Sequence, residues 1–193
     1  NDKNLGKKVL TTIEQELSTC DEFMFSVAFI TTSGIASLKQ TLKELEYRKV
    51  PGKILASQYL NFTQPEALKR LIQFSNIELR IATQDNSHIK SFIFNNDLNY
   101  NIIVGSSNLT ANALSTNKEW NLKISATDQS ELIGVAVEEF RQEFEVAQEV
   151  KEGYLIEYDL LWRARTKFER EINERRKTFE DLKVTPNLMQ KEA

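Results

Sequence analysis

The chain has 193 residues, 40% of them hydrophobic and 27% charged, and its formal net charge is −3. This length suits one domain of ordinary size with an appendage, and the apolar fraction is enough for a buried core. Proteins that coat nucleic acid without regard to sequence are usually basic, so any phosphate binding here must come from a local patch of the surface.

Cysteine content and hydropathy indicate the compartment. The single cysteine, Cys20, excludes an intramolecular disulfide and is typical of a reducing environment. No apolar run approaches the roughly 20 residues that a membrane span needs, and the first residues lack the apolar segment of a signal peptide. We therefore predict a cytoplasmic protein.

Apolar residues in the first half of the chain alternate between the spacing of helices and that of strands. The pattern predicts helices over residues 5–17, 32–45 and 65–75, and strands over residues 22–30, 53–60 and 77–83. The first of these strands is almost wholly apolar and aromatic, which is typical of a strand buried on both faces. The alternation favours an α/β fold with a mostly parallel sheet that helices flank on both faces.

The second half adds an antiparallel hairpin. Two apolar segments flank the polar sequence NNDLNY at residues 95–100, so the strands on either side would pair and make the sheet mixed. A short helix over residues 109–114, a strand over residues 119–126 and a long helix over residues 130–148 follow. We expect residues 1–150 to form one domain.

The composition changes after Gly153. Residues 151–193 are dense in both charges, and the sparse large apolar residues fall on a heptad-like stripe made of Leu161, Phe168, Ile172, Phe179 and Leu182. The simpler interpretation is a charged helical linker that is exposed and packs one edge on a neighbour. A dimeric coiled coil is the alternative, although the stripe is short and arginines interrupt it.

The last residues of the sequence resemble the start of a different motif. Pro186 is followed by Asn187, an apolar pair and Gln190, which is similar to the Q motif that opens superfamily 2 helicase domains. In that family the glutamine recognises adenine. The likeness is short, but it predicts that the chain is the N-terminal piece of a longer protein in which a helicase domain follows.

The predicted hairpin carries the residues with chemical potential. His88 is the only histidine, and Lys90 follows two residues later, so both side chains point to one face of an extended strand. After the second strand, Ser106 and Asn108 offer hydroxyl and amide donors, and the acidic Glu119 lies near the start of a core strand. Together they predict an anion site. Taken singly, a packed histidine and a capped turn explain them as well.

The spacing of these residues resembles a known motif. The HKD motif of the phospholipase D superfamily is similar to the series His88-x-Lys90, Gly105-Ser106-x-Asn108-x-Thr110 and Asn117-x-Glu119. The likeness is closest to the nuclease-like branch found in restriction enzymes and in front of helicase domains. It implies a phospholipase D-like fold for residues 1–150, and the predicted order of helices and strands also fits.

The resemblance also implies a role for each residue. In the family the histidine attacks phosphorus and forms a phosphohistidine, so His88 would be the nucleophile. Lys90 and Asn108 would hold the non-bridging oxygens of the phosphate, and Ser106 would support the same group. Glu119 would orient His88. The family's reaction needs no metal ion or other cofactor.

Two features separate this chain from a complete family site. The mechanism needs a second histidine as general acid, and this chain has none, so the resemblance implies a homodimer whose sites meet at the two-fold axis. The family also usually has aspartate seven residues after the histidine, where this chain has Asn95 with Asp97 nearby. Either Asp97 substitutes for that aspartate, or its structural role is lost.

Three functions follow as hypotheses. The leading one is a metal-independent phosphodiesterase that acts on DNA, as the nuclease module of a larger helicase or restriction-type protein. The alternative is a catalytically silent module that binds DNA or dimerises a helicase, which the acidic balance and Asn95 favour. A lipid phosphodiesterase is the weakest of the three, because no amphipathic helix has the basic face that membrane binding would use.

Overall fold

The computed structural model describes residue 1 and residues 8–57, 62–83 and 88–181, with side chains described as far as residue 175. Its contacts divide the chain into two compact units, Asn1–Leu155 and Ile156–Ala193. Among the described residues, the first unit contains the sheet and five of the six helices. The second contains most of a long helix, and the prediction of a linker that leads to another domain stays a prediction.

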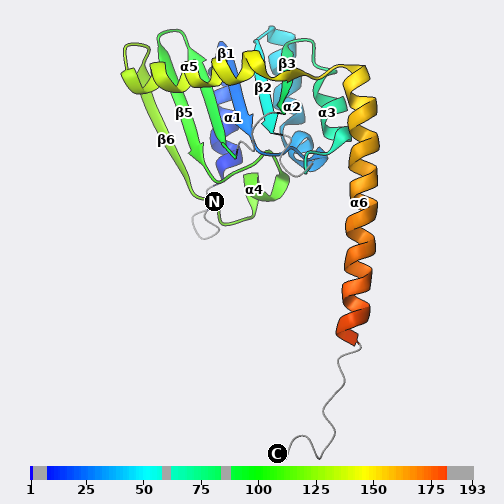
Figure 1. Cartoon of the computed structure of the whole chain (residues 1–193). Helices are drawn as coiled ribbons and strands as arrows, with labels where there is room; N and C mark the ends of the chain where they lie inside the picture. The colour runs from blue at the N-terminus through cyan, green and yellow to red at the C-terminus, as the bar shows by residue number, and fades with distance from the viewer. Residues whose placement is uncertain (2–7, 58–61, 84–87, 182–193) are drawn as a thin grey trace, which may run out of the picture. The chain divides into compact units, whose positions relative to one another are not determined.

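The first unit is built on one seven-stranded sheet (Figure 1). Its strands are β1 (Glu22–Val27), β2 (Gly52–Ser57), β3 (Ile77–Ala82), β4 (Ser91–Asn96), β5 (Asn99–Gly105), β6 (Asn121–Thr127) and β7 (Gln148–Glu149). Their order across the sheet is β6-β5-β4-β1-β2-β3-β7. The hairpin strand β4 therefore lies next to the first strand of the chain, at the centre of the sheet.

The predicted α/β class with a mixed sheet is confirmed, and four strands, β1, β2, β3 and β5, run in the same direction. Only two pairs of neighbouring strands are parallel, however, namely β1 with β2 and β2 with β3. The other four pairs are antiparallel. The reason is that parallel neighbours need a long crossover connection, and after β3 the chain continues through hairpin strands instead.

Helices cover both faces of this sheet. They are α1 (Val9–Thr19), α2 (Thr32–Arg48), α3 (Pro65–Leu71), α4 (Ala111–Ser115), α5 (Glu131–Val146) and the start of α6 (Glu152–Asp181). Figure 1 shows α5 crossing one face of the sheet, with α1 and α2 on the other. Residue type explains where two of them begin: the Thr31 hydroxyl accepts a hydrogen bond from Gly34 N at 3.2 Å to cap α2, and Pro65 occupies the first turn of α3.

The two faces of the sheet bury different side chains. On the side of α1 and α2, aromatic rings of β1 and β4 pack together, with the ring of Phe25 4.9 Å from Phe92 and 5.7 Å from Phe94. On the side of α5 lies a mostly aliphatic cluster made of Met24, Leu55, Ile93, Ile102, Ile133, Val137, Phe140 and Phe144. The strand β1 contributes to both, which confirms that it is buried on both faces.

Strand direction brings distant loops to one edge of the sheet. The strands β1, β2, β3 and β5 end at this edge, which we call the carboxyl edge, and β4, β6 and β7 begin there. The opposite edge, which we call the turn edge, holds the turn between β4 and β5. All five residues predicted to carry the chemistry fall next to the carboxyl edge, because they precede β4 and β6 or follow β5.

Most element boundaries differ from the predicted ones by a few residues, and α3 ends at Leu71, earlier than predicted. The first helix begins at Val9, and the predicted contribution of Leu5 lies outside the described residues. The helix predicted over residues 130–148 ends at Val146, because Gln148 pairs with Ile81 in the short strand β7. The likeness to a Q motif around Gln190 also lies outside the described residues.

The part of α6 in the second unit is a polar helix with ion pairs along its surface. Three of these join residues four apart, namely Asp159 with Arg163, Arg165 with Glu169, and Arg170 with Glu174. Leu161 and Phe168 of the heptad-like stripe are 57% and 63% exposed. Among the described residues, no helix combines the length and the hydropathy that crossing a membrane would demand.

Candidate phosphate-binding site

The side chains of His88 and Lys90 lie against each other directly before β4. Lys90 Nζ is 2.6 Å from His88 Nδ1 and donates a hydrogen bond to the His88 carbonyl oxygen at 2.5 Å. Ile89, between them, faces the other side of the sheet, where it borders an apolar groove with Val104. The alternation of faces predicted from the sequence therefore brings the imidazole and the amine together.

Lys90 is almost completely buried, with 6% of its surface exposed. Burial lowers the pKa of its amine, because a charged group loses hydration there, and the nearby charge of Glu119 works in the opposite direction. Lysine is rarely buried without a partner. A bound anion would oppose the lowering of the pKa in the same way as Glu119 does, so the position suits a group that contacts a phosphate.

Asn108 is held in one orientation by two backbone amides of the segment directly after β1. Its Oδ1 accepts hydrogen bonds from Ala28 N at 3.0 Å and from Phe29 N at 3.2 Å. The side chain is 7% exposed. Because the Asn108 Oδ1 atom faces the backbone, the Nδ2 end of the side-chain amide points away from it. The carboxamide is thus arranged as a hydrogen-bond donor toward any ligand at this edge.

The contact of Asn108 with Ala28 and Phe29 is one of several between the segments that follow β1 and β5, and together these contacts form a bridge over the start of β4. The chain leaving β1 and the chain leaving β5 meet there: Thr31 N donates to Leu109 O at 3.1 Å, and Ile30 pairs with Leu109 as a parallel β-bridge. In the sheet, β4 lies between β1 and β5. The bridge therefore spans the strand that Lys90 precedes, which accounts for the burial of Lys90.

Ser106 and Glu119 form the third part of the site. The Ser106 hydroxyl donates a short hydrogen bond to Glu119 Oε2 and accepts one from Trp120 N at 3.0 Å. Ser106 N in turn donates to Trp120 O at 2.9 Å. The loop after β5 is thereby fixed to the segment before β6. The carboxylate of Glu119 reaches Ser106 directly and Lys90 through its charge, whereas its predicted role in orienting His88 stays a prediction.

Two glycines allow the loops at this edge to approach so closely. A Cβ atom on Gly34 would lie 2.0 Å from Leu109 O, and one on Gly105 would lie 2.1 Å from Trp120 O. Both contacts are with backbone, which cannot move aside cheaply. Gly105 therefore admits the backbone of the segment that leads into β6.

Sequence reasoning missed a buried polar pair that supports the loop after β5. Ser107 is fully buried, and its hydroxyl accepts a hydrogen bond from Asn121 Nδ2 at 3.0 Å. The helix that follows, α4, has five residues, and the hydroxyl of Thr110 caps it by accepting from Ala113 N at 3.1 Å. A serine and an asparagine fourteen positions apart give no sequence signal, because only the pairing of β5 with β6 brings them together.

Asn95 and Asp97, the departure from the family pattern, lie far from these residues. Asn95 is near the end of β4, opposite Glu22 and Tyr100, and Asp97 forms the turn between β4 and β5 with a positive φ of 52°. Six residues of extended strand separate the turn edge from Lys90, a length of roughly 20 Å. Asp97 does not replace a group at the carboxyl edge, and Asn95 removes none from it.

The carboxyl edge therefore gathers an imidazole, a buried amine, an amide donor and a hydroxyl–carboxylate pair. The imidazole and the amine can each carry positive charge, and the N–H groups of Lys90 and Asn108 can donate hydrogen bonds to oxygen atoms of an anion. Within the described ranges, no three histidine, cysteine, aspartate or glutamate side chains come together as ligands for a metal ion. The arrangement can bind an anion and present a nitrogen nucleophile to it.

Comparison with known families agrees with this geometry. Residues 13–147 match the family model described as "Cardiolipin synthase, PLD-like domain". The match covers more than half of the chain and includes all five predicted site residues. The chain belongs to the phospholipase D-like domain family. No curated protein matches the sequence.

Solved structures share the fold at low sequence identity. NucT from Helicobacter pylori matches with a TM-score of 0.57 and 19% identity over 74% of this chain and 91% of its own. Nuc from Salmonella typhimurium, a phospholipase D family member, matches with a TM-score of 0.58 and 18% identity over 74% of this chain and 90% of its own. Phosphatidylserine synthase from Haemophilus influenzae matches with a TM-score of 0.56 and 14% identity over 84% of this chain and 42% of its own. These likenesses support the phospholipase D-like fold.

Proposed function

We propose that this chain is a phosphodiesterase that cleaves DNA through a phosphohistidine on His88. The observation that carries the proposal is the buried amine of Lys90, 2.6 Å from the His88 ring, beside an Asn108 amide whose oxygen is bound to backbone. Membership of the phospholipase D-like family and the fold shared with Nuc support it.

In the proposed reaction, one ring nitrogen of His88 attacks phosphorus, and the bond from phosphorus to the leaving oxygen breaks. Lys90 and Asn108 donate to the non-bridging oxygens, where negative charge develops, and Ser106 supports the same group. The leaving oxygen takes a proton from a general acid. Water then attacks the phosphohistidine, which releases the phosphate monoester and regenerates the imidazole.

The general acid has to come from a second copy of the chain, because the sequence has one histidine. Two copies with their carboxyl edges facing would supply one nucleophile and one acid to a single phosphate. Mixing wild-type protein with an excess of His88→Ala protein tests this arrangement. If subunits exchange, the activity per wild-type chain should fall well below that of a dilution with buffer. Activity that only follows the dilution would contradict a shared site.

The central test is turnover in EDTA. Purified protein should cleave DNA and bis(p-nitrophenyl) phosphate with EDTA present, and His88→Ala should lower the rate by about a thousandfold or more, as is typical when a nucleophile is removed. Trapping with a labelled phosphodiester should give an acid-labile phosphohistidine. Activity that survives in the His88→Ala protein would exclude this nucleophile. DNA binding without turnover in the wild type would favour the silent binding module.

We also infer that residues 1–150 act as a module of a larger helicase or restriction-type protein in the cytoplasm, with residues 151–193 as a charged linker. The polar surface of α6 and the short likeness around Gln190 support this. Protein isolated from its source cells should then exceed the 22.3 kDa of this chain and hydrolyse ATP. A cellular protein of this size without ATPase activity would contradict it.

A lipid phosphodiester is a second candidate substrate, because an apolar groove begins near the site, on the face of the sheet opposite His88 and Lys90. The groove, of about 320 Å³, lies between α5 and the strands, and Ile89, Val104, Leu132 and Val135 line it together with other residues. Ile89 is the residue between His88 and Lys90. Assays with phosphatidylcholine or cardiolipin vesicles beside the DNA assay would decide between the substrates, and turnover of vesicles alone would replace the DNA assignment.

A further inference from the structure

Trp120 occupies an exposed position that nothing in the fold requires. Its side chain is 86% exposed, and among the large hydrophobic side chains of the described residues only Tyr47 is more exposed, at 89%. It follows Glu119 and precedes β6. An indole of this size usually packs into a core or meets a partner, because leaving it in water forfeits most of its contribution to stability.

The backbone fixes this indole next to the candidate site. Trp120 N and Trp120 O both hydrogen-bond to Ser106, at 3.0 Å and 2.9 Å. Ser106 also contacts Glu119, so the phosphate-supporting loop and the indole belong to one hydrogen-bonded unit. A phosphate bound at Ser106 therefore lies next to the residue that carries the indole.

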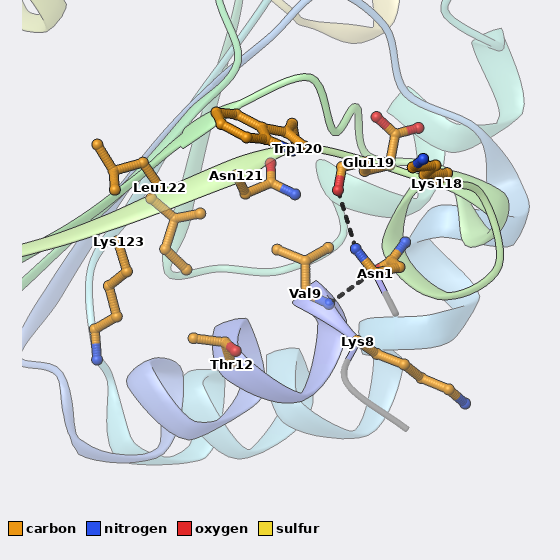
Figure 2. A pocket seen from close by; sticks show the side chains of 11 residues that line it. Asn1, Lys8, Val9, Thr12, Lys118, Glu119, Trp120, Asn121, Leu122 and Lys123 are labelled. Atoms are coloured by element: carbon orange, nitrogen blue, oxygen red, sulfur yellow. Dashed lines mark hydrogen bonds between the residues drawn. The ribbon is translucent and has the colours of Figure 1, made fainter. Parts of the chain in front are cut away.

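Three lysines line the same hollow as this indole. Trp120 stands at the rim of a hollow of about 570 Å³ between β6 and the start of α1, which Lys8, Lys118 and Lys123 also line (Figure 2). Lys123 is bound to Glu16 at 2.5 Å. Lys8 and Lys118 are exposed and form no ion pair with another described residue. The chain as a whole is acidic, so Lys8 and Lys118, which share this hollow with the Glu119 carboxylate, are the local cations that binding of a polyanion would use.

The combination favours nucleic acid over a protein partner. Lysine is depleted from the centres of protein–protein interfaces, whereas aromatic rings set among lysines are the usual components of grooves for single strands. A base in a duplex is already stacked on its neighbours, so an exposed indole gains most from a base that is unpaired.

We propose that Trp120 is a stacking platform for an unpaired base next to the scissile phosphate, and that Lys118 and Lys8 bind the adjoining phosphates. The protein would then prefer single-stranded DNA to duplex. This inference rests on the proposed function, since it assumes that the phosphodiester at His88 belongs to DNA.

The test measures binding in the His88→Ala protein, so that cleavage does not interfere. A labelled oligothymidylate and a duplex of the same length are titrated at fixed salt. Trp120→Ala should weaken binding of the single strand about tenfold, which is the typical effect of losing one stacked base, and change duplex binding by less than about twofold. Trp120→Phe should restore most of the affinity, because it keeps an aromatic face.

Tyr47→Ala is the matched control. Tyr47 is an equally exposed aromatic residue, but it lies in the last turn of α2, at the turn edge. The Tyr47→Ala substitution should leave the affinities for the single strand and for the duplex unchanged. Lys118→Ala should reduce the slope of log Kd against log salt by roughly 0.7, the value for one phosphate contact on a single strand.

A second measurement uses fluorescence. Trp162 is the other tryptophan of the chain, so in a Trp162→Phe protein the indole emission comes from Trp120 alone. Oligothymidylate should quench it more strongly than duplex, as stacking predicts. Equal quenching by both, or none, would contradict the platform.

Several outcomes would overturn the inference and leave the proposed function standing. Unchanged single-strand affinity in Trp120→Ala, or an equal loss on both forms of DNA, would do so while His88-dependent cleavage persists. Sedimentation that shows Trp120→Ala converting a dimer to monomers would assign the indole to a contact between copies. Conversely, Trp120-dependent binding of single strands without any turnover would support the platform and refute the phosphodiesterase.

Discussion

The two edges of the sheet use similar polar residues in opposite ways. At the turn edge, Asn76 Nδ2 donates to Val50 O at 2.6 Å and Arg48 donates to two backbone carbonyls, so these side chains serve the fold. At the carboxyl edge, Asn108 uses only its oxygen for the fold, and Nδ2 donates to no acceptor among the described residues. Residue type alone therefore does not decide what an asparagine can offer a ligand. The end of the amide that the backbone occupies decides it, and at Asn108 the donor end is left for a ligand.

The same substitution at each edge should separate these roles, and we expect the largest effect from Asn108→Asp. A carboxylate keeps an oxygen for Ala28 N and Phe29 N but replaces the donor with negative charge. Turnover of bis(p-nitrophenyl) phosphate should fall about a hundredfold to a thousandfold, as for the loss of one charge-stabilising donor. The free energy of unfolding should change by less than about 1 kcal/mol.

Asn76→Asp is the matched control. It loses the donor to Val50 O, so it should lower the free energy of unfolding by about 1–3 kcal/mol and leave turnover unchanged. Urea unfolding and the turnover assay check both variants. Equal effects of the two substitutions on turnover would erase the distinction between the edges.

Glycine substitutions should give the next largest effect. Gly34→Ala places a Cβ 2.0 Å from Leu109 O, next to Asn108, so we expect a loss of about 2–3 kcal/mol of stability and reduced turnover. Gly134→Ala, in α5, meets nothing within 4 Å and should instead stabilise the protein by about 0.5–1 kcal/mol. Thermal unfolding distinguishes the two. A neutral Gly34→Ala would mean that the loops at the carboxyl edge yield easily.

Arg48→Ala should have the smallest effect. The guanidinium donates to Ser18 O at 2.8 Å and to Cys20 O at 3.1 Å from an exposed position, so its removal should cost about 1 kcal/mol, or about 2–4 °C in Tm for a chain of this size. Phosphodiester turnover should stay at the wild-type rate. A loss of turnover without a loss of Tm would show that the turn edge also communicates with the site.

Sequence reasoning reached the fold class because its signals are local. Helical spacing in α1, α2 and α5, a mostly apolar β1 and the polar turn of the hairpin are each contained in one short stretch. The strand β7 escaped because two residues show no periodicity, and Gln148 looks like the continuation of a helix. The share of antiparallel pairs also escaped, because periodicity does not reveal which strands become neighbours.

At the site, the sequence identified the groups but not their supports. Spacing alone placed His88 beside Lys90. It gave no hint that Asn108 would be oriented by the amides of Ala28 and Phe29, because backbone amides have no side-chain signature. Trp120 was read as part of a strand, since aromatic residues favour strands whether they are buried or exposed.

The bridge between the ends of β1 and β5 has a consequence for how the protein becomes competent during synthesis. Ala28 and Asn108 are 80 residues apart, so the contact is non-local, and in the sheet β4 lies between the two strands whose ends it joins. A nascent chain that has emerged only as far as Lys90 has its imidazole and amine but lacks Asn108, Ser106 and Glu119. The groups of the candidate site therefore come together only when the strands on both sides of β4 have been synthesised.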